Sequence, residues 1–384
     1  MPHSSDSRVP LSTIVREWGR IGLIGFGGPP AHIALFRTLC VDERQWITDH
    51  EFADGIAATN LLPGPSSTQL AIYCAWRLRG RLGAVIGGIC FIVPGLIIIL
   101  ALSALFLSAH PPRWVLGAAA GAGAAVPAVA LNAAWALVPA SWDRAGPERA
   151  VKVRWIAYLL VGGISAATIG AFLVLTLVVC GAVEIALRTG GTGRRLPSLV
   201  PVAVVPVVGG TAALGWVALK VGALSYGGGF VIIPLMQHDA VATYHWMTGA
   251  QFLNAVALGQ VTPGPVVQTV AVVGYAASGL WGGVLAAVVA FTPSFVFITL
   301  GATHFGRLRT DPRVQAFFVG AGTAVIGAIA GSSIPLGLEL SHLWQLGVLA
   351  AAAIWLLALR RGVVLALVGA GAIGIVAVLA GAPS

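Results

Sequence analysis

The stretch from Arg20 to Gln69 contains Gly25-Phe26-Gly27-Gly28, Trp46-Ile47-Thr48, Phe52 and Asn60-Leu61-Leu62-Pro63-Gly64-Pro65. Two hundred residues later the chain repeats this pattern as Ser225-Tyr226-Gly227-Gly228, Trp246-Met247-Thr248, Phe252 and Gln260-Val261-Thr262-Pro263-Gly264-Pro265. Chance matches in a glycine-rich chain do not give a Trp-x-Thr-x-x-x-Phe frame that ends at a shared Pro-Gly-Pro. The sequence therefore contains an internal duplication, and such a repeat is interpreted before any local pattern.

The composition indicates a membrane protein. Of the 384 residues 58% are hydrophobic and only 9% are charged, and the mean hydropathy is +0.91. A soluble domain carries about 25% charged residues, so this chain cannot cover a surface that faces water. We therefore predict an all-α polytopic membrane protein. The uncharged runs long enough to cross a bilayer are 82–108, 114–140, 155–182, 280–303, 314–338 and the pair 342–359 and 363–382.

The positions of the basic residues predict how the two copies are oriented. The net charge is +9, but Lys and Arg gather in short loops, which is typical of the positive-inside bias and does not favour nucleic-acid binding. Loop 77–81 carries three arginines, its counterpart 276–281 carries none, and the following turn of the second copy, 307–313, again carries three. This alternation predicts two homologous repeats in inverted topology, with the Pro-Gly-Pro segments as re-entrant hairpins from opposite faces. The side of the membrane that holds the N-terminus stays open.

We divide the chain into an N-terminal repeat at 1–187, a charged cytoplasmic linker at 188–198 and a C-terminal repeat at 199–384. In both repeats, glycine and proline breaks leave half-helices too short to cross a bilayer, which needs about 20 residues. Irregular backbone at membrane depth survives only where protein or a water-filled cavity satisfies it, and paired breaks are typical of transporter binding sites. The chain lacks a G-x-x-x-x-G-K-[ST] motif, so transport would be driven by an ion gradient or membrane potential.

Small polar residues flank both breaks. A helix N-terminus presents free N–H groups and about half a positive charge, which suits an anion. Their duplication favours a binding site over two simple helix kinks. The predicted substrate-binding residues here are Gly27, Gly28, Asn60, Gly64, Ser66, Ser67, Thr68, Gln69, Gly227, Gly228, Gln260, Thr262, Gly264, Gln268 and Thr269, and the helix-breaking residues are Pro63, Pro65, Pro263 and Pro265.

Two aligned cations add to this predicted site. Arg20 and Lys220 each lie seven residues before a glycine break, on the same helix face. An intramembrane cation costs at least about 2.5 kcal/mol on insertion scales and is a functional hypothesis by default, here as counter-charge for an anion. The alternative is pairing with an acid or reaching the interface. Glu17 lies one turn from Arg20, whereas Lys220 has no such neighbouring acid in its own helix.

Two acids distinguish the first repeat from the second. Glu51 and Asp54 align with Gln251 and Asn254, so a titratable group in one half only could couple transport to protons. The alternative is an interfacial acid that pairs with a neighbouring base. Glu184 and Glu339 lie near helix ends, where we expect them at the interface. The histidines and cysteines show no metal-ligand spacing, and we predict no metal, cofactor or catalytic residue.

At Phe26-Gly27-Gly28 and Pro63-Gly64-Pro65, repeated as Tyr226-Gly227-Gly228 and Pro263-Gly264-Pro265, the chain resembles the chromate ion transporter family in its long, two-domain form. The resemblance covers nearly the whole chain. It implies chromate efflux across the bacterial inner membrane, with resistance as the result, driven by the proton-motive force or membrane potential. Chromate and sulfate are both tetrahedral dianions, so the residues themselves do not choose between them.

The main hypothesis is therefore a secondary transporter that exports a small oxyanion, with chromate as the expected substrate. The first alternative is uptake or exchange of sulfate or another oxyanion. Alternatives of another class are a non-transporting membrane scaffold and an intramembrane enzyme; no paired-histidine metal motif or Ser/His dyad supports the enzyme. The expected partners are the oxyanion and the lipid bilayer, with a homodimer as a further prediction.

Overall fold

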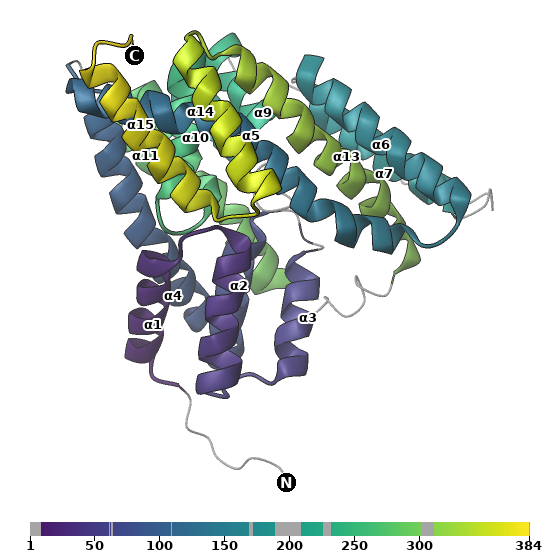
Figure 1. Ribbon diagram of the computed structural model, residues 1–384. Coiled ribbons are helices and arrows are strands. Elements are labelled where there is room, and N and C mark those ends of the chain that lie inside the picture. The colour runs from purple at the N-terminus through teal and green to yellow at the C-terminus, as the bar shows by residue number, and fades with distance from the viewer. Residues whose placement is uncertain are drawn as a thin grey trace.

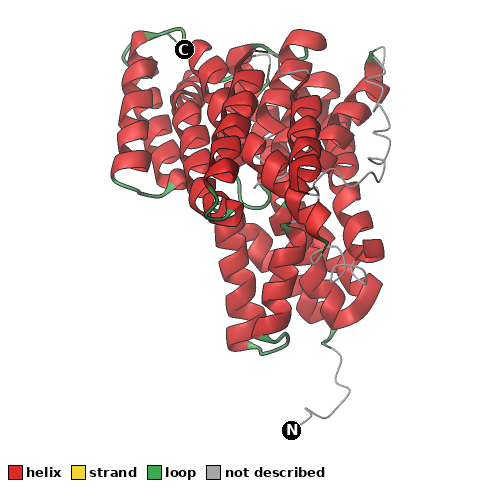
Figure 2. Ribbon diagram, turned by 90° about the vertical axis from the view of Figure 1, so that its right-hand side faces the viewer, coloured by secondary structure: helices red, strands yellow, loops and turns green. Residues whose placement is uncertain are grey.

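The computed structural model of the protein describes residues 9–60, 62, 64–108, 110–168, 172–188, 209–225, 232–301 and 311–383. Within these ranges every regular element is a helix (Figure 2). The first half contains α1 (Leu11–Ile24), α2 (Pro29–Arg37), the π-helical turn η1 (Thr38–Glu43), α3 (Asp49–Thr59), α4 (Ser66–Phe106), α5 (Arg113–Ala145), α6 (Arg149–Thr168) and α7 (Leu173–Arg188). The second half contains α8 (Gly210–Leu224), α9 (Ile232–Gln237), η3 (His238–Thr243), α10 (Gly249–Val261), η4 (Val266–Gln268), α11 (Thr269–Gly301), α13 (Pro312–Leu338), α14 (Leu343–Ala353), η6 (Ile354–Ala358) and α15 (Val363–Leu379).

The helices have the length and the surface of a membrane protein. Among the described residues, five helical segments are long and apolar enough to cross a bilayer: 66–106, 113–145, 149–168, 266–301 and 312–338. Large apolar side chains such as Ile97, Ile164 and Leu300 are exposed on their outer faces, where lipid replaces water as the solvent. The polytopic all-α prediction is confirmed. The run 155–182 falls on two helices, α6 and α7.

The repeated Trp-x-Thr frame builds the same local structure twice. The π-helical turns η1 and η3 begin 200 residues apart, and each is followed by a residue with positive φ, Gln45 or His245. The next backbone N–H, from Trp46 or Trp246, donates to a carbonyl of its own π turn at 2.8 Å. Thr48 and Thr248 then cap α3 and α10 in capping boxes. The motif therefore specifies a turn and a helix start, which accounts for its spacing.

Helices α4 and α11 each fold back on themselves near their start. Gly80 and Gly279 adopt positive φ (+59° and +64°) inside these helices, 199 residues apart. A Cβ atom added to Gly87 would lie 2.4 Å from Ala75, although twelve residues of straight helix would separate them by about 18 Å. Each helix is thus a short segment, a reversal and a long apolar segment. The predicted loop at residues 77–81 is confirmed, and its three arginines lie around the reversal.

The two halves interlock. Helix α1 packs on α4, the equivalent α8 packs on α11, and α4 and α11 contact each other. The C-terminal hairpin of each half reaches across, because α6 and α7 pack on α13 of the second half, while α14 and α15 pack on α5 of the first half. Figure 1 shows α6 and α7 beside α13, and α14 and α15 beside α5. Each hairpin therefore packs mainly against the other half.

These crossings depend on small residues. A Cβ atom on Gly162 of α6 would lie 2.0 Å from the Ala324 carbonyl oxygen of α13, and one on Gly327 would lie 1.8 Å from the Leu159 carbonyl oxygen. In the other crossing, Gly121 of α5 would meet the Ala370 carbonyl of α15 at 2.2 Å. Helix association within lipid relies on such close backbone approach, because apolar burial alone gives little driving force there.

Candidate functional site

The Pro-Gly-Pro turn of each half packs against the long helix of the other half. We call this region the Pro-Gly-Pro junction and define it as residues 64–69 and 262–269 with Gly95 and Ser294. A Cβ atom on Gly64 would lie 3.3 Å from the Ser294 hydroxyl of α11, and one on Gly95 of α4 would lie 2.1 Å from the Pro263 carbonyl oxygen. Gly95 and Ser294 each follow the proline inside their helix. The two contacts are therefore equivalent, and both are formed between halves.

Hydrogen bonds also join the halves at the junction. The Gln268 amide nitrogen donates to the Ile92 carbonyl oxygen of α4 at 2.8 Å. The Gly264 N–H donates to the Gly25 carbonyl oxygen, at the end of α1, at 3.0 Å. That oxygen also lies 2.9 Å from Nε2 of the buried His32, and since a carbonyl can only accept, Nε2 carries the hydrogen. His32 was not among the predicted site residues.

The polar side chains of the junction are deeply buried. Ser67, Thr68, Gln69, Gln268 and Thr269 are at most 2% exposed. Helix α4 begins at Ser66 with no side chain capping its first turn, so its first N–H groups remain available. Among the predicted site residues, the structure therefore brings together those of Gly64–Gln69 from the first half with Thr262, Gly264, Gln268 and Thr269 from the second.

Several buried polar atoms at or near the breaks have no hydrogen-bond partner among the described residues. They are the hydroxyl oxygens of Thr68, Ser225 and Ser294 and the amide nitrogen of Gln260. An unsatisfied buried polar group costs about 1–3 kcal/mol, and native proteins contain few of them. Ser225 and Ser294 were not among the predicted site residues. The alignment of Ser294 with Gly95, across the same helix break, is the signal that would have found it.

Other predicted residues lie outside this buried group or outside the described residues. Asn60 and Gly27 are exposed, and Gly28 is half-buried. The Thr262 hydroxyl bonds its own helix at Leu258 O, 2.6 Å away. Pro63, Gly227, Gly228 and residues 189–198 of the predicted linker lie outside the described residues. Their predicted roles stay predictions.

Both predicted cations have acidic partners. Arg20 lies 3.1 Å from the carboxylate of Glu17, which is buried and also contacts Arg16. Lys220 Nζ lies 2.6 Å from the carboxylate of Asp239 in η3. Lys220 has no acid within α8 itself, as the sequence shows, but the π-helical turn η3 returns Asp239 to it from 19 residues away. Within the described residues, no hydrogen bond or ion pair of either cation reaches the junction.

The two acids of the first repeat lie at the start of α3. Glu51 closes the capping box with Thr48 and pairs with Arg77. Partial burial raises the pKa of Glu51, but hydrogen bonds from Thr48 and the charge of Arg77 outweigh it and hold the pKa below its usual range. Glu51 is therefore ionised at neutral pH. Asp54 lies 3.1 Å from the ring of His50, a neighbouring base one turn away in the same helix.

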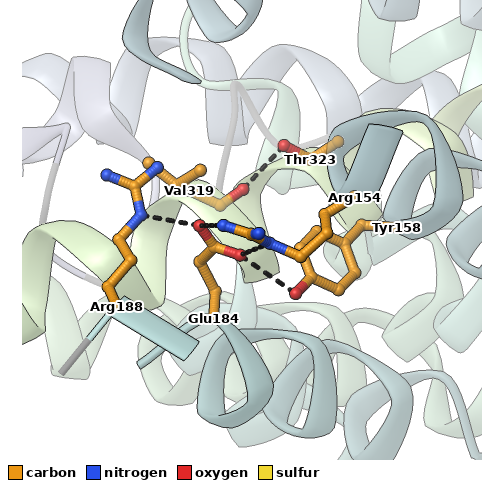
Figure 3. Close-up of polar contacts among 6 residues, drawn as sticks. All are labelled: Arg154, Tyr158, Glu184, Arg188, Val319 and Thr323. Atoms are coloured by element: carbon orange, nitrogen blue, oxygen red, sulfur yellow. Dashed lines mark hydrogen bonds and ion pairs between the residues drawn. The ribbon is translucent and has the colours of Figure 1, made fainter. Parts of the chain in front are cut away.

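A second polar cluster lies between α6 and α7 (Figure 3). Glu184 is 0% exposed, and its carboxylate accepts hydrogen bonds from Arg154 at 2.9 Å, Arg188 at 2.6 Å and the Tyr158 hydroxyl at 3.0 Å. Glu184 lies near the end of α7, as expected, and the hairpin packs it against α13, where Gly320 leaves room for it. Its place at the membrane interface stays a prediction. Arg154 and Tyr158, like Glu184 and Arg188, are spaced four residues apart on one helix face, which was the available signal.

A cavity of about 320 Å³ opens where the halves meet, away from the first repeat's acids. Its lining comes from the ends of α4 and α13 and the starts of α5, α10 and α14, and includes Gln251, Asn254 and Glu339. Gln251 and Asn254 are the amide counterparts of Glu51 and Asp54. Glu339, expected at the interface, packs against Gly249 at the first position of α10.

Fold and site define the class of the protein: a helical, multi-pass membrane protein whose two similar halves bring paired helix breaks together. Sequence comparison adds the family. The family model described as chromate transporter matches residues 12–187 and 212–375. The chain belongs to the chromate transporter family.

Relatives agree with this assignment. The chain is 33% identical to the chromate transport protein of Cupriavidus metallidurans, over 85% of this chain and 82% of that protein. It is 31% identical to the chromate transport protein of Pseudomonas aeruginosa, over 83% and 79%, and 29% identical to a probable chromate transport protein of Synechococcus elongatus, over 86% of each. No solved structure matches the chain. The similarity to proteins named for transport favours a transporter over an enzyme.

Proposed function

We propose that the protein is a secondary transporter that exports a small oxyanion, with chromate as substrate, across the bacterial inner membrane. The observation that carries the proposal is the Pro-Gly-Pro junction, where each half's turn packs on the other half's long helix amid buried hydroxyls and amides. Neutral hydrogen-bond donors and an uncapped helix start suit a dianion. The names of the relatives support chromate as the substrate.

We further propose that the halves are inverted repeats with re-entrant hairpins. Helices α1, α2 and α3 lie together at the lower end of the molecule in Figure 1, whereas α9 and α10 lie in its upper part. Arginines surround the reversal of α4, and the reversal of α11 carries none. Both observations support insertion of the two hairpin sets from opposite faces. Motion of one set against the other would expose the junction to each side in turn, driven by the proton-motive force or membrane potential.

The experiment that tests this proposal is chromate flux in proteoliposomes, with a proton gradient and a membrane potential imposed separately. Wild type should move chromate, and Gly264→Ala should lose most of the flux, because a Cβ atom there would lie 3.3 Å from the Gln268 amide at φ +99°. Gly146→Ala is the matched control, since Gly146 has φ +88° but nothing within 4 Å of its Cβ position.

Sulfate is the competing substrate in the same assay. Flux of sulfate without chromate would keep the transporter and change its substrate. Uptake of chromate into everted vesicles identifies export, and loss of chromate from them identifies uptake into the cell. Correctly inserted protein that moves neither anion would contradict the proposed function and favour a scaffold.

A further inference from the structure

The two Pro-Gly-Pro turns differ in a way that identifies one of them as the anion site. On the first side, α4 begins directly at Ser66 and carries four consecutive polar residues, Ser66 to Gln69. On the second side a short 3-10 turn, Val266–Gln268, precedes α11, and two of its three residues are valine. Counted from the reversals at Gly80 and Gly279, Thr68 aligns with Val267 and Gln69 with Gln268.

The second turn is locked by its own hydrogen bonds. Gln268 donates to Ile92, and the Thr269 hydroxyl donates to the Val266 carbonyl oxygen at 2.8 Å. The Gly264 N–H is bonded to Gly25. Gly95, the residue that faces this turn from the opposite half, has no side chain and would meet Pro263 if it had one. Among the described residues of the second turn, 262–269, both hydroxyls, those of Thr262 and Thr269, are therefore already bonded to backbone carbonyls.

The first turn has the opposite properties. The residue that faces it from the other half is Ser294, whose hydroxyl lies beside Gly64, is 0% exposed and has no partner in the described chain. The hydroxyl of Thr68, in the first turn of α4, is also 0% exposed and lacks a partner. Both groups can donate to an anion, and nothing else in the described structure uses them.

We propose, on the basis of the transport function proposed above, that the oxyanion binds at the first turn only, to Thr68, to Ser294 and to the N-terminus of α4. The second turn is its locked structural counterpart. The Gln69 amide nitrogen lies 2.5 Å from the Cβ position of Gly64 and covers this glycine, so its side chain moves aside when the anion binds. The site binds a small tetrahedral dianion through uncharged donors, and each half contributes one of the two hydroxyl groups.

The experiment compares hydroxyl deletions in purified, reconstituted protein. Thr68→Val and Ser294→Ala should each weaken chromate binding about ten- to hundredfold, because a hydrogen bond to a charged group is lost. Binding is measured as KM for flux and as the chromate concentration that stabilises the protein against heat. The matched controls Thr323→Val and Ser332→Ala should change both readouts less than about twofold. Both residues are buried in α13 and donate to carbonyls of that helix, Thr323 to Val319 O at 2.6 Å and Ser332 to Ile329 O at 2.7 Å.

A readout without chromate separates binding from folding. Because Thr68 and Ser294 leave buried hydroxyls unsatisfied, their deletion should leave the melting temperature of the unliganded protein unchanged or raise it. Equal losses of chromate affinity in Thr68→Val and in the second-turn variant Thr269→Val would overturn the one-sided site. So would wild-type affinity in both Thr68→Val and Ser294→Ala. In either case the transport function would stand. Absence of chromate and sulfate flux in wild type would instead remove the proposed function on which the site rests.

Discussion

Lys220 is a cation in an otherwise apolar helix, and its contact with Asp239 changes how its role is tested. We expect Lys220→Met to destabilise the protein by about 3–5 kcal/mol, because Asp239 then stays largely buried without its partner. The double variant with Asp239→Asn should recover most of this loss, since no charge is left behind. Thermal unfolding in detergent measures both. Arg20→Met is the matched comparison for Lys220→Met. When Arg20 is removed, its partner Glu17 still contacts Arg16 and Arg44.

If Lys220 were counter-charge for the anion, the double variant would recover stability but not chromate flux. Recovery of both would identify the pair as structural.

Glu51 is one of the two acids predicted to couple transport to protons, and its lowered pKa argues against that role. Glu51→Gln reproduces the residue of the second repeat, Gln251, and keeps an acceptor for the capping box. A group with a lowered folded pKa contributes stability above its unfolded value, here 4.5, and loses it as pH falls through the folded value. We expect a loss of up to about 1 kcal/mol at pH 7, because the ion pair is half-exposed, and a vanishing difference under strong acid.

The pH profile of chromate flux between pH 6 and 8 should be the same in wild type and Glu51→Gln. A profile that shifts would show that Glu51 exchanges protons during transport. Asp54→Asn, which again copies the second repeat, tests the other acid in the same assay.

At the scale of elements, the crossing of α6 and α13 depends on Gly327. Its Cβ position is 1.8 Å from a backbone oxygen of Leu159, so Gly327→Ala forces the helices apart and should cost about 1–3 kcal/mol. Gly337→Ala in the same helix has nothing within 4 Å and should be nearly neutral. Thermal unfolding compares the stability of the two variants. Equal melting temperatures would mean that α6 and α13 can move apart without loss of stability.

Local structure was predictable here and the pairing of elements was not. The Trp46-Ile47-Thr48 frame and the reversal at Gly80 each follow from backbone chemistry encoded within a few residues. The described structure contains both twice, because Trp246-Met247-Thr248 and Gly279 repeat them. The partner of a helix face is not encoded in this way, because an apolar stripe is compatible with any other apolar stripe. For that reason the sequence did not reveal the ion pair of Asp239 with Lys220 or the burial of Glu184 against α13.

At the scale of the whole molecule, the exchange of hairpins predicts how the halves depend on each other. A chain cut within 189–208, between α7 and α8, and expressed as two pieces should assemble into a functional complex, because α6 and α7 pack mainly on α13 and α15 packs mainly on α5. Either piece alone should be degraded or aggregate. Co-purification of the pieces through a tag on one of them measures this, and a stable, monomeric first half would contradict it.

The same exchange constrains how such a chain could have arisen. Before duplication, a protein with one repeat would have lacked the helix of a second copy on which the α6–α7 hairpin makes most of its contacts. Two identical subunits, inserted in opposite orientations and trading hairpins, satisfy that requirement. Fusion of their genes would then have freed each copy to diverge. The equivalent positions Gly95 and Ser294, a glycine in one half and a serine in the other, are an example of such divergence.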